Sequence, residues 1–169
     1  SLPLVAPLYP DFIQPFSFED RRSKKMVVDA RNIVAFIPGS TSKKVIVVTA
    51  HYDHVGIGRP DSSGDSIYNG ADDNASGTAA LLELAAYFSK NRPQHGMLFA
   101  ALDAEEMGLQ GAKALVNDFP YPLEQIVLNV NMDMLSRSEA KEVFVSGTYY
   151  YPEFKSILEK IPQGTGSTL

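Results

Sequence analysis

Three segments rich in apolar residues constrain the fold of this chain more than any other feature. They cover residues 45–50, 97–102 and 126–131 and are short enough to be buried strands. Between them, residues 74–91 and 108–119 place small and apolar side chains at helical spacing. Strands apolar on both faces that alternate with helices are typical of a mainly parallel sheet covered on both sides. The sequence therefore predicts an α/β fold, a three-layer α/β/α sandwich.

The N-terminal part predicts antiparallel strands beside this parallel core. Residues 25–39 and 43–51 are both rich in β-forming residues, and a short polar turn separates them. This pattern favours an antiparallel hairpin, so we expect a mixed sheet. Residues 1–25 hold prolines among aromatic residues and are expected to form an extended arm that packs on the body.

The C-terminal part adds two further expected elements. Residues 141–147 predict a fourth strand of the core, and residues 152–161 predict a helix that begins at a proline. The chain has 169 residues, which is about the length of one domain. We therefore expect a single domain over residues 1–169.

Composition excludes several functional classes. Hydrophobic residues make up 44% of the chain and charged residues 21%, which is typical of a globular domain. The net charge is −5 and no basic stripe offsets it, so nucleic acid is not an expected partner. There is no cysteine, which excludes disulfides and thiolate metal ligands. No apolar run reaches about 18 residues, so no membrane span is expected.

Polar side chains follow the predicted strands at the point where each strand ends. Ligands of such sheets bind beyond the carboxyl ends of the strands. The residues concerned are His51, Asp53 and His54 after the first strand, Asp103, Glu105 and Glu106 after the second, Asp133 after the third, and Asp72 and Asp73 before the first helix. The sequence thus gathers acids and imidazoles at one rim of the sheet.

Each of these residues has an ordinary structural explanation when it is taken alone. An aspartate before a helix is usually an N-cap, a loop acid is usually solvated, and a single histidine is usually structural. Together, however, the carboxylates would repel one another strongly unless a cation neutralised them. Imidazole plus carboxylates without thiolate suits Zn²⁺, Mn²⁺ or Co²⁺. Asp53, two residues after His51, is placed to hold that imidazole in one tautomer.

Four motifs carry a family resemblance. The stretches TAHYDH, NGADDNASG, DAEEMGLQGA and NMDM occur in this order within residues 32–136. They resemble the dinuclear zinc exopeptidases, the family of secreted bacterial leucyl aminopeptidases and glutamate carboxypeptidase II. Glutaminyl cyclases are single-zinc relatives. The resemblance implies a metal-dependent exopeptidase, with aminopeptidase the preferred activity, a peptide substrate and a secreted or periplasmic location.

The resemblance also implies individual roles. It makes His51 and Asp133 ligands of one zinc, Asp73 the carboxylate that bridges two zincs, and Glu106 a ligand of the other zinc. Glu105 matches the general base, which would take a proton from the attacking water and pass it to the leaving amine. Asp53 matches the acid behind His51.

One nearby acid and one peptide bond are also covered by the resemblance. Asp72 is expected to have no metal contact, and the Asp73–Asn74 peptide bond is expected to be cis. Asp103 and His54 have no transferable role, and support of the loop is the default expectation for both.

The chain departs from the family in one respect. The family takes a further histidine ligand from downstream of the NMDM motif, whereas the histidines of this chain are His51, His54 and His95. His95 precedes a predicted strand of six residues, so it lies about 20 Å from the rim, at roughly 3.3 Å per residue. We therefore expect a fold truncated at the C-terminus, which represents a fragment of a longer peptidase.

This departure leaves consequences and alternatives open. The complete enzyme is expected to bind two zinc ions, and this chain at most one tightly, with weak hydrolysis. Missing strands would leave an apolar edge that invites self-association. The alternatives are a catalytically incomplete binding domain that keeps the fold, and a glutaminyl-cyclase-like acyltransferase, which the presence of His51 disfavours.

Overall fold

The structure, a computed structural model, describes residues 4–140 and 142–161. The chain forms two compact units, residues 1–134 and residues 135–169. The first unit contains one sheet of six strands: β1 (Ala6–Pro7), β2 (Ile13–Glu19), β3 (Met26–Ile37), β4 (Val45–His51), β5 (Gly96–Leu102) and β6 (Ile126–Asn131). Its longer helices are α1 (Gly77–Lys90) and α2 (Gln110–Asn117), and three short helical turns are η1 (Pro10–Phe12), η2 (Ala71–Ser76) and η3 (Leu123–Gln125).

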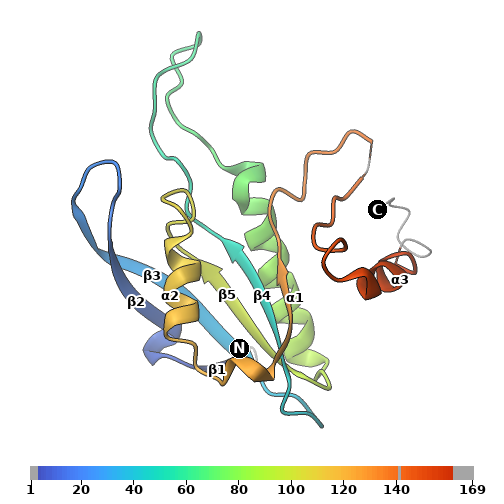
Figure 1. Cartoon of the computed structure of the whole chain (residues 1–169). Coiled ribbons are helices and arrows are strands. Elements are labelled where there is room, and N and C mark those ends of the chain that lie inside the picture. Colours follow the sequence, from blue (N-terminus) through green and yellow to red (C-terminus); the bar gives the residue numbers. More distant parts are fainter. Residues whose placement is uncertain (1–3, 141, 162–169) are drawn as a thin grey trace. The chain divides into compact units, whose positions relative to one another are not determined.

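The sheet is mixed, as the sequence predicts, with the order β1-β3-β5-β4-β6 and β2 also paired to β3 (Figure 1). β4 runs parallel to both β5 and β6, whereas β3 runs antiparallel to β1, β2 and β5. The predicted hairpin between residues 25–39 and 43–51 is therefore wrong, because β5 lies between β3 and β4. The physical reason is pairing: β4 pairs in parallel with β5 at one edge and with β6 at the other, so neither edge is left for β3. Six of the seven residues of β4 are buried, as expected of such an interior strand.

The segment expected as an extended arm joins the sheet. β1 pairs with the end of β3, and β2 pairs with β3 along most of its length. A turn closes the β2–β3 hairpin, where the Asp20 carboxylate accepts hydrogen bonds from the backbone amides of Arg22 and Ser23 at 3.0 Å each. The described part of residues 1–25 is thus an edge of the sheet.

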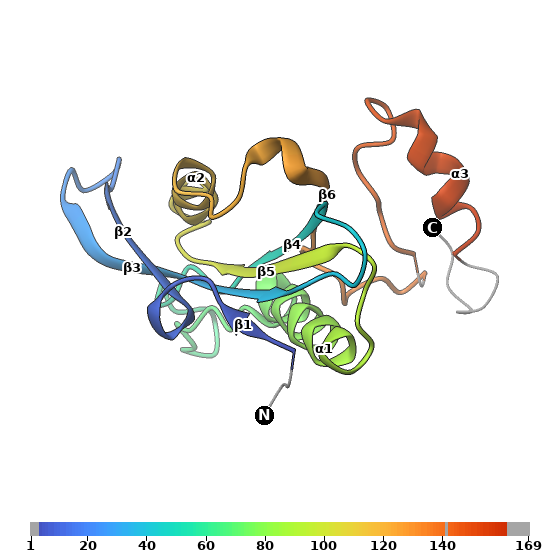
Figure 2. The ribbon, with the colours of Figure 1, turned by 90° about the horizontal axis from the view of Figure 1, so that it is seen from below.

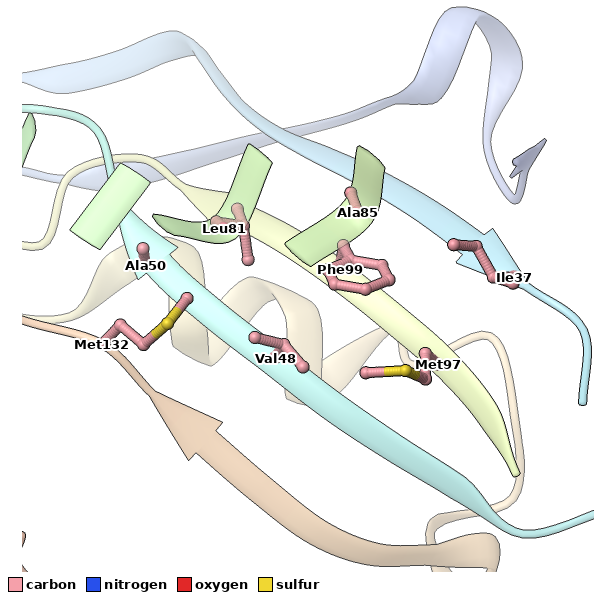
Figure 3. Close-up of a cluster of buried hydrophobic side chains, with 8 residues drawn as sticks. All are labelled: Ile37, Val48, Ala50, Leu81, Ala85, Met97, Phe99 and Met132. Carbon is pink, nitrogen blue, oxygen red and sulfur yellow. The ribbon is translucent and has the colours of Figure 1, made fainter. Parts of the chain in front are cut away.

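Helices cover both faces of the sheet, which confirms the three-layer architecture. α1 lies against one face and α2 against the other (Figure 2). The core beneath α1 consists of Ile37, Val48, Ala50, Leu81, Ala85, Met97, Phe99 and Met132 (Figure 3). The core beneath α2 consists of Val34, Val45, Val47, Leu98, Ala100, Leu102 and Leu115. Burial of each large side chain contributes about 1.5–3 kcal/mol, so these two layers hold the carboxyl ends of β4 and β5 rigidly.

The second unit is described over residues 135–140 and 142–161. It contains η4 (Pro152–Phe154) and α3 (Lys155–Leu158), which confirms a helix after Pro152, though a shorter one than residues 152–161. The predicted strand over residues 141–147 is not observed, apart from a single bridge residue at Glu142 within the described positions 142–147. Phe144 in this segment is 88% exposed, because no strand in the described part of this unit pairs with it. Across the described residues, the helices are too short or too polar to cross a membrane.

Candidate metal centre

The carboxyl ends of β4, β5 and β6 meet at one rim of the sheet, as predicted. His51 at the end of β4 is paired with Leu102 at the end of β5, and Thr49 of β4 is paired with Asn131 at the end of β6. The residues that follow these ends therefore gather beside His51, which is only 3% exposed. η2 carries Asp73 to the same place from the start of α1.

One group of donor atoms surrounds the Nε2 atom of His51. This atom lies 3.1 Å from Oδ1 of Asp73 and 3.5 Å from Oδ1 of Asp133. Ligands about 2.0–2.1 Å from a tetrahedral zinc ion lie about 3.3–3.4 Å from one another, so the observed spacing fits a zinc ion. We call this group the first position. It contains the three residues that the resemblance implies for it.

A second group surrounds the Nδ1 atom of His54. This atom lies 2.9 Å from Oε1 of Glu106 and 4.0 Å from Oδ2 of Asp73, and one ligand atom from each residue lies within 4.8 Å of the others. We call this group the second position. Asp73 offers one carboxylate oxygen to each position, which is the arrangement expected of a bridging ligand.

Two atoms of the second position are buried without a hydrogen-bond partner: Nδ1 of His54 and Oε1 of Glu106. Buried polar atoms are nearly always paired, since an unpaired one costs about 1–3 kcal/mol. A divalent cation would satisfy both atoms, because imidazole nitrogen and carboxylate oxygen are zinc ligands. The donor set thus fits a metal at this place.

Asp53 binds differently from the expectation. The Nδ1–H of His51 donates to the backbone carbonyl of Asp53 at 3.2 Å, whereas the carboxylate oxygen Oδ1 lies 3.6 Å away. The carboxylate instead accepts hydrogen bonds from the backbone amides of Glu105 at 2.9 Å and Glu106 at 3.2 Å. The tautomer of His51 is still fixed, because the carbonyl can only accept, and Nε2 keeps its lone pair toward the first position. Asp53 also fixes the segment that carries both glutamates.

Glu105 is placed next to a largely apolar cavity that reaches the first position. The cavity has a volume of about 250 Å³ and lies between α2 and the strands β4 and β6. Its lining includes His51, Glu105, Asp133, Leu102, Leu115, Phe119 and Ile126. Burial raises the pKa of Glu105; His51 opposes this shift, and the carboxylates of Glu106 and Asp133 add to it. A carboxylate in such surroundings is suited to accept a proton.

The pKa of His51 is raised for a different reason. Burial alone would lower its pKa, but the hydrogen bond to the Asp53 carbonyl and the charges of Asp133 and Glu105 outweigh burial, so the pKa is raised. The raised pKa therefore comes from the Asp53 carbonyl and from the carboxylates around the ring. A bound cation would neutralise those carboxylates in the same way.

The remaining candidates have structural contacts. Asp103 accepts hydrogen bonds from the backbone amides of Arg31 at 2.9 Å and Ala104 at 2.8 Å, which matches its expected support of the loop. His95 lies just before β5 and therefore at the amino end of that strand, away from the rim. Asp72 belongs to neither position among the described residues. The Asp73–Asn74 peptide bond is cis, as expected.

Sequence reasoning missed two residues of the site. His54 was given only a supporting role, although it follows the end of β4 and so reaches the same rim as His51. Asn74 is 2% exposed, and its side chain donates a hydrogen bond to the backbone carbonyl of Met132, next to Asp133. The two residues are 58 positions apart, so no local sequence pattern predicts this contact. The first omission could have been found from the spacing of HYDH, but the second could not.

A rim where imidazoles and carboxylates form two groups that share one aspartate is typical of dinuclear metallohydrolases. The chain belongs to peptidase family M28, because residues 32–169 match the model of that family. It is 34% identical, over 68% of its length, to a protein of Pyrenophora tritici-repentis described as a probable zinc metalloprotease. It is 33% identical, over 69% of its length, to the aminopeptidase YwaD of Bacillus subtilis.

Solved structures share the fold. A zinc aminopeptidase of Bacillus subtilis superposes with a TM-score of 0.60 at 26% identity and covers 81% of this chain. A glutaminyl cyclase of Bacteroides thetaiotaomicron superposes with a TM-score of 0.72 at 20% identity and covers 98% of this chain. This chain covers 35% of the former protein and 61% of the latter. It spans about a quarter of the length of the curated relatives, 26% of the Pyrenophora protein and 25% of YwaD.

Proposed function

We propose that this chain carries part of the catalytic site of a zinc-dependent aminopeptidase that acts on peptides. The observation that carries the proposal is the position of Asp73, whose two oxygens face His51 and His54 respectively, beside Glu105. Membership of peptidase family M28 and the likeness to YwaD support the reaction class and the metal.

Zinc bound at this rim would supply a Lewis acid that activates water and polarises the scissile carbonyl. The residues of the chain divide the remaining work. Glu105 accepts a proton from the attacking water at the mouth of the cavity and donates it to the leaving amine. Asp53 holds the backbone of Glu105, so the carboxylate stays in reach of the reacting atoms. The Asp53 carbonyl keeps Nε2 of His51 free to bind the metal.

The test of this proposal is the Glu105→Gln variant, assayed with aminoacyl-anilide substrates and for zinc content. Glutamine keeps the size of the side chain but cannot accept the proton, so we expect zinc content to be unchanged and turnover to fall by about 10²–10⁴-fold. A variant that hydrolyses the substrate at nearly the parent rate contradicts the role of Glu105.

The number of metal ions is part of the proposal. Two zinc ions are proposed for the complete enzyme, and the first position is proposed as the tighter site in this chain. His51 is 3% exposed and contributes a nitrogen of fixed tautomer there, which favours high affinity. Equilibrium dialysis against zinc, with His51→Ala for comparison, measures the occupancy of this position.

A glutaminyl-cyclase-like activity is the second candidate, since a glutaminyl cyclase covers nearly the whole chain. Single-zinc chemistry would not need the first position, yet His51, Asp73 and Asp133 are all in place there. An assay with N-terminal glutaminyl peptides distinguishes the two. Release of pyroglutamyl product at a higher rate than anilide hydrolysis would favour the cyclase.

Self-association and export are proposed as well. β6 is the last strand of the sheet order and exposes Val127 by 42% and Val130 by 39%, so its open edge can pair with another copy. A sedimentation coefficient that rises with protein concentration supports this, and a constant monomer value contradicts it. A secreted or periplasmic location is proposed because the four motifs resemble those of secreted bacterial aminopeptidases. Cell fractionation measures it directly.

A further inference from the structure

His54 occupies a place in the candidate metal centre for which the sequence motifs predict no ligand. It follows β4 in the loop that leaves the rim, and its side chain turns toward Asp73 and Glu106. Its Nδ1 lies 2.9 Å from Oε1 of Glu106, yet the two atoms do not meet the geometry of a hydrogen bond and both are buried without one. Two buried atoms that can each bind a metal ion therefore lie close together, and neither makes a hydrogen bond.

The loop after His54 holds the imidazole in this orientation. Residues 56–70 leave the rim and return, with Ile57 paired to Ile67 and the amide of Tyr68 bonded to the carbonyl of Gly56 at 2.9 Å. The return brings the ring of Tyr68 edge-on to His54, with centroids 6.4 Å apart.

The backbone of Gly70 also lies close to the ring. A Cβ atom at Gly70 would lie 3.0 Å from Cγ of His54, and its φ of +65° favours glycine. The imidazole is thus held next to the Tyr68 ring and the Gly70 backbone, with Nδ1 close to Asp73 and Glu106. A confined ring loses little further entropy when it binds a ligand, which is the condition for a tight site.

We infer that His54 binds the second metal ion through Nδ1, together with Asp73 and Glu106. This inference rests on the proposed function, and it gives the second position three protein ligands in place of the two that sequence reasoning supplied. The chain then binds two zinc ions, and each position has three protein ligands. Asp73 contributes to both.

The three histidines of the chain permit a direct test on the unmodified protein. Imidazole ¹⁵N NMR during a zinc titration reports each ring nitrogen separately. We expect Nε2 of His51 and Nδ1 of His54 to shift to metal-bound values, and His95, at the far end of β5, to stay unchanged. If only His51 shifts while two equivalents of zinc bind, His54 is not a ligand and the inference is overturned.

A variant pair gives a second, independent readout. His54→Phe keeps a ring between Tyr68 and Gly70 but removes the nitrogen, and His95→Phe is the matched control. Equilibrium dialysis with zinc should give two ions for the parent and the control, and one for His54→Phe, with the other affinity weakened more than about 100-fold. Equal zinc binding by parent and His54→Phe overturns the inference but leaves the proposed function standing. A parent that binds no zinc overturns both.

Discussion

The side-chain amide of Asn74 donates a hydrogen bond to the backbone carbonyl of Met132, with 3.0 Å between Nδ2 and O. The Oδ1 atom of the same side chain accepts from the amides of Gly77 at 3.0 Å and Met134 at 3.3 Å. Asn74 follows Asp73 directly, and Met132 and Met134 flank Asp133. One buried amide therefore fixes the distance between two carboxylates of the first position, although it touches no metal-facing atom itself.

Replacing Asn74 with alanine should weaken zinc binding. Loss of the amide releases Asp73 from Asp133, and partners of this kind contribute about 10–100-fold to metal affinity. The carbonyl of Met132 and the amide of Gly77 would also lose their partner, at about 1–3 kcal/mol each in the free energy of unfolding. Isothermal titration with zinc and urea unfolding measure both effects.

Asn91→Ala is the control for that experiment. Asn91 is exposed at the end of α1, and its side chain bonds only the nearby Tyr87 carbonyl among the described contacts. Zinc affinity of this variant should equal that of the parent. An Asn74→Ala protein with parental zinc affinity would show that Asn74 does not position the carboxylates.

The Asp53→Asn variant should lower kcat. An asparagine side chain offers one acceptor oxygen and one amide group, so it cannot accept from both the Glu105 and Glu106 amides. We expect kcat to fall by at least about tenfold and KM to change little, because Glu105, the proposed general base, is displaced. The readout is the separate measurement of kcat and KM.

The matching control for Asp53 is Asp65→Asn, an exposed aspartate of the loop whose carboxylate accepts one bond from the amide of Ile67. It should leave both kinetic constants unchanged. If Asp53→Asn also leaves kcat unchanged, the hydrogen bonds to the glutamate amides have no role in turnover.

Asn32→Leu should destabilise the first unit. Asn32 is fully buried; its Nδ2 donates to Gln14 Oε1 at 2.9 Å and to the Gly111 carbonyl at 2.8 Å, and its Oδ1 accepts from the Asp103 amide at 3.0 Å. Leucine is similar in size but leaves three buried groups unpaired, at about 1–3 kcal/mol each. Urea unfolding of Asn32→Leu beside Asn117→Leu, an exposed position in α2, measures the loss. Equal midpoints for the two variants would contradict this account.

The class of fold followed from the sequence because burial on both faces leaves a recognisable pattern in β4 and β5. The order of the strands in the sheet could not be predicted in the same way. Residues 38–44 connect β3 to β4 with the length of a hairpin loop, but β5 pairs with both strands from a segment far along the chain, and no local pattern shows this. The meeting of His51, Asp73 and Asp133 could be predicted because each lies at or just beyond the carboxyl end of a strand or before the first long helix. The contact of Asp53 with the Glu105 and Glu106 amides could not, since it depends on how two loops meet.

Alkaline pH should destabilise the chain through two tyrosines. Burial, together with the nearby charge of Asp118 for Tyr9 and of Asp103 for Tyr52, raises the pKa of each phenol from 10.0 to about 12. The phenol is therefore ionised more readily in the unfolded state, so the stability it contributes is complete below about pH 10 and is lost as the pH rises to about 12. Burial also raises the pKa of Tyr121, so ultraviolet titration should show at least two phenols that ionise late, and Tyr9→Phe or Tyr52→Phe should each remove one. Titration of all tyrosines together near pH 10 would contradict the prediction.

Anomalous diffraction at the zinc absorption edge, on crystals of the chain grown with zinc, tests the central claim most directly. The account predicts a peak at bonding distance, about 2.0–2.2 Å, from Nε2 of His51 and from one oxygen each of Asp73 and Asp133. A map with no peak between these three side chains, at full zinc saturation, would contradict it.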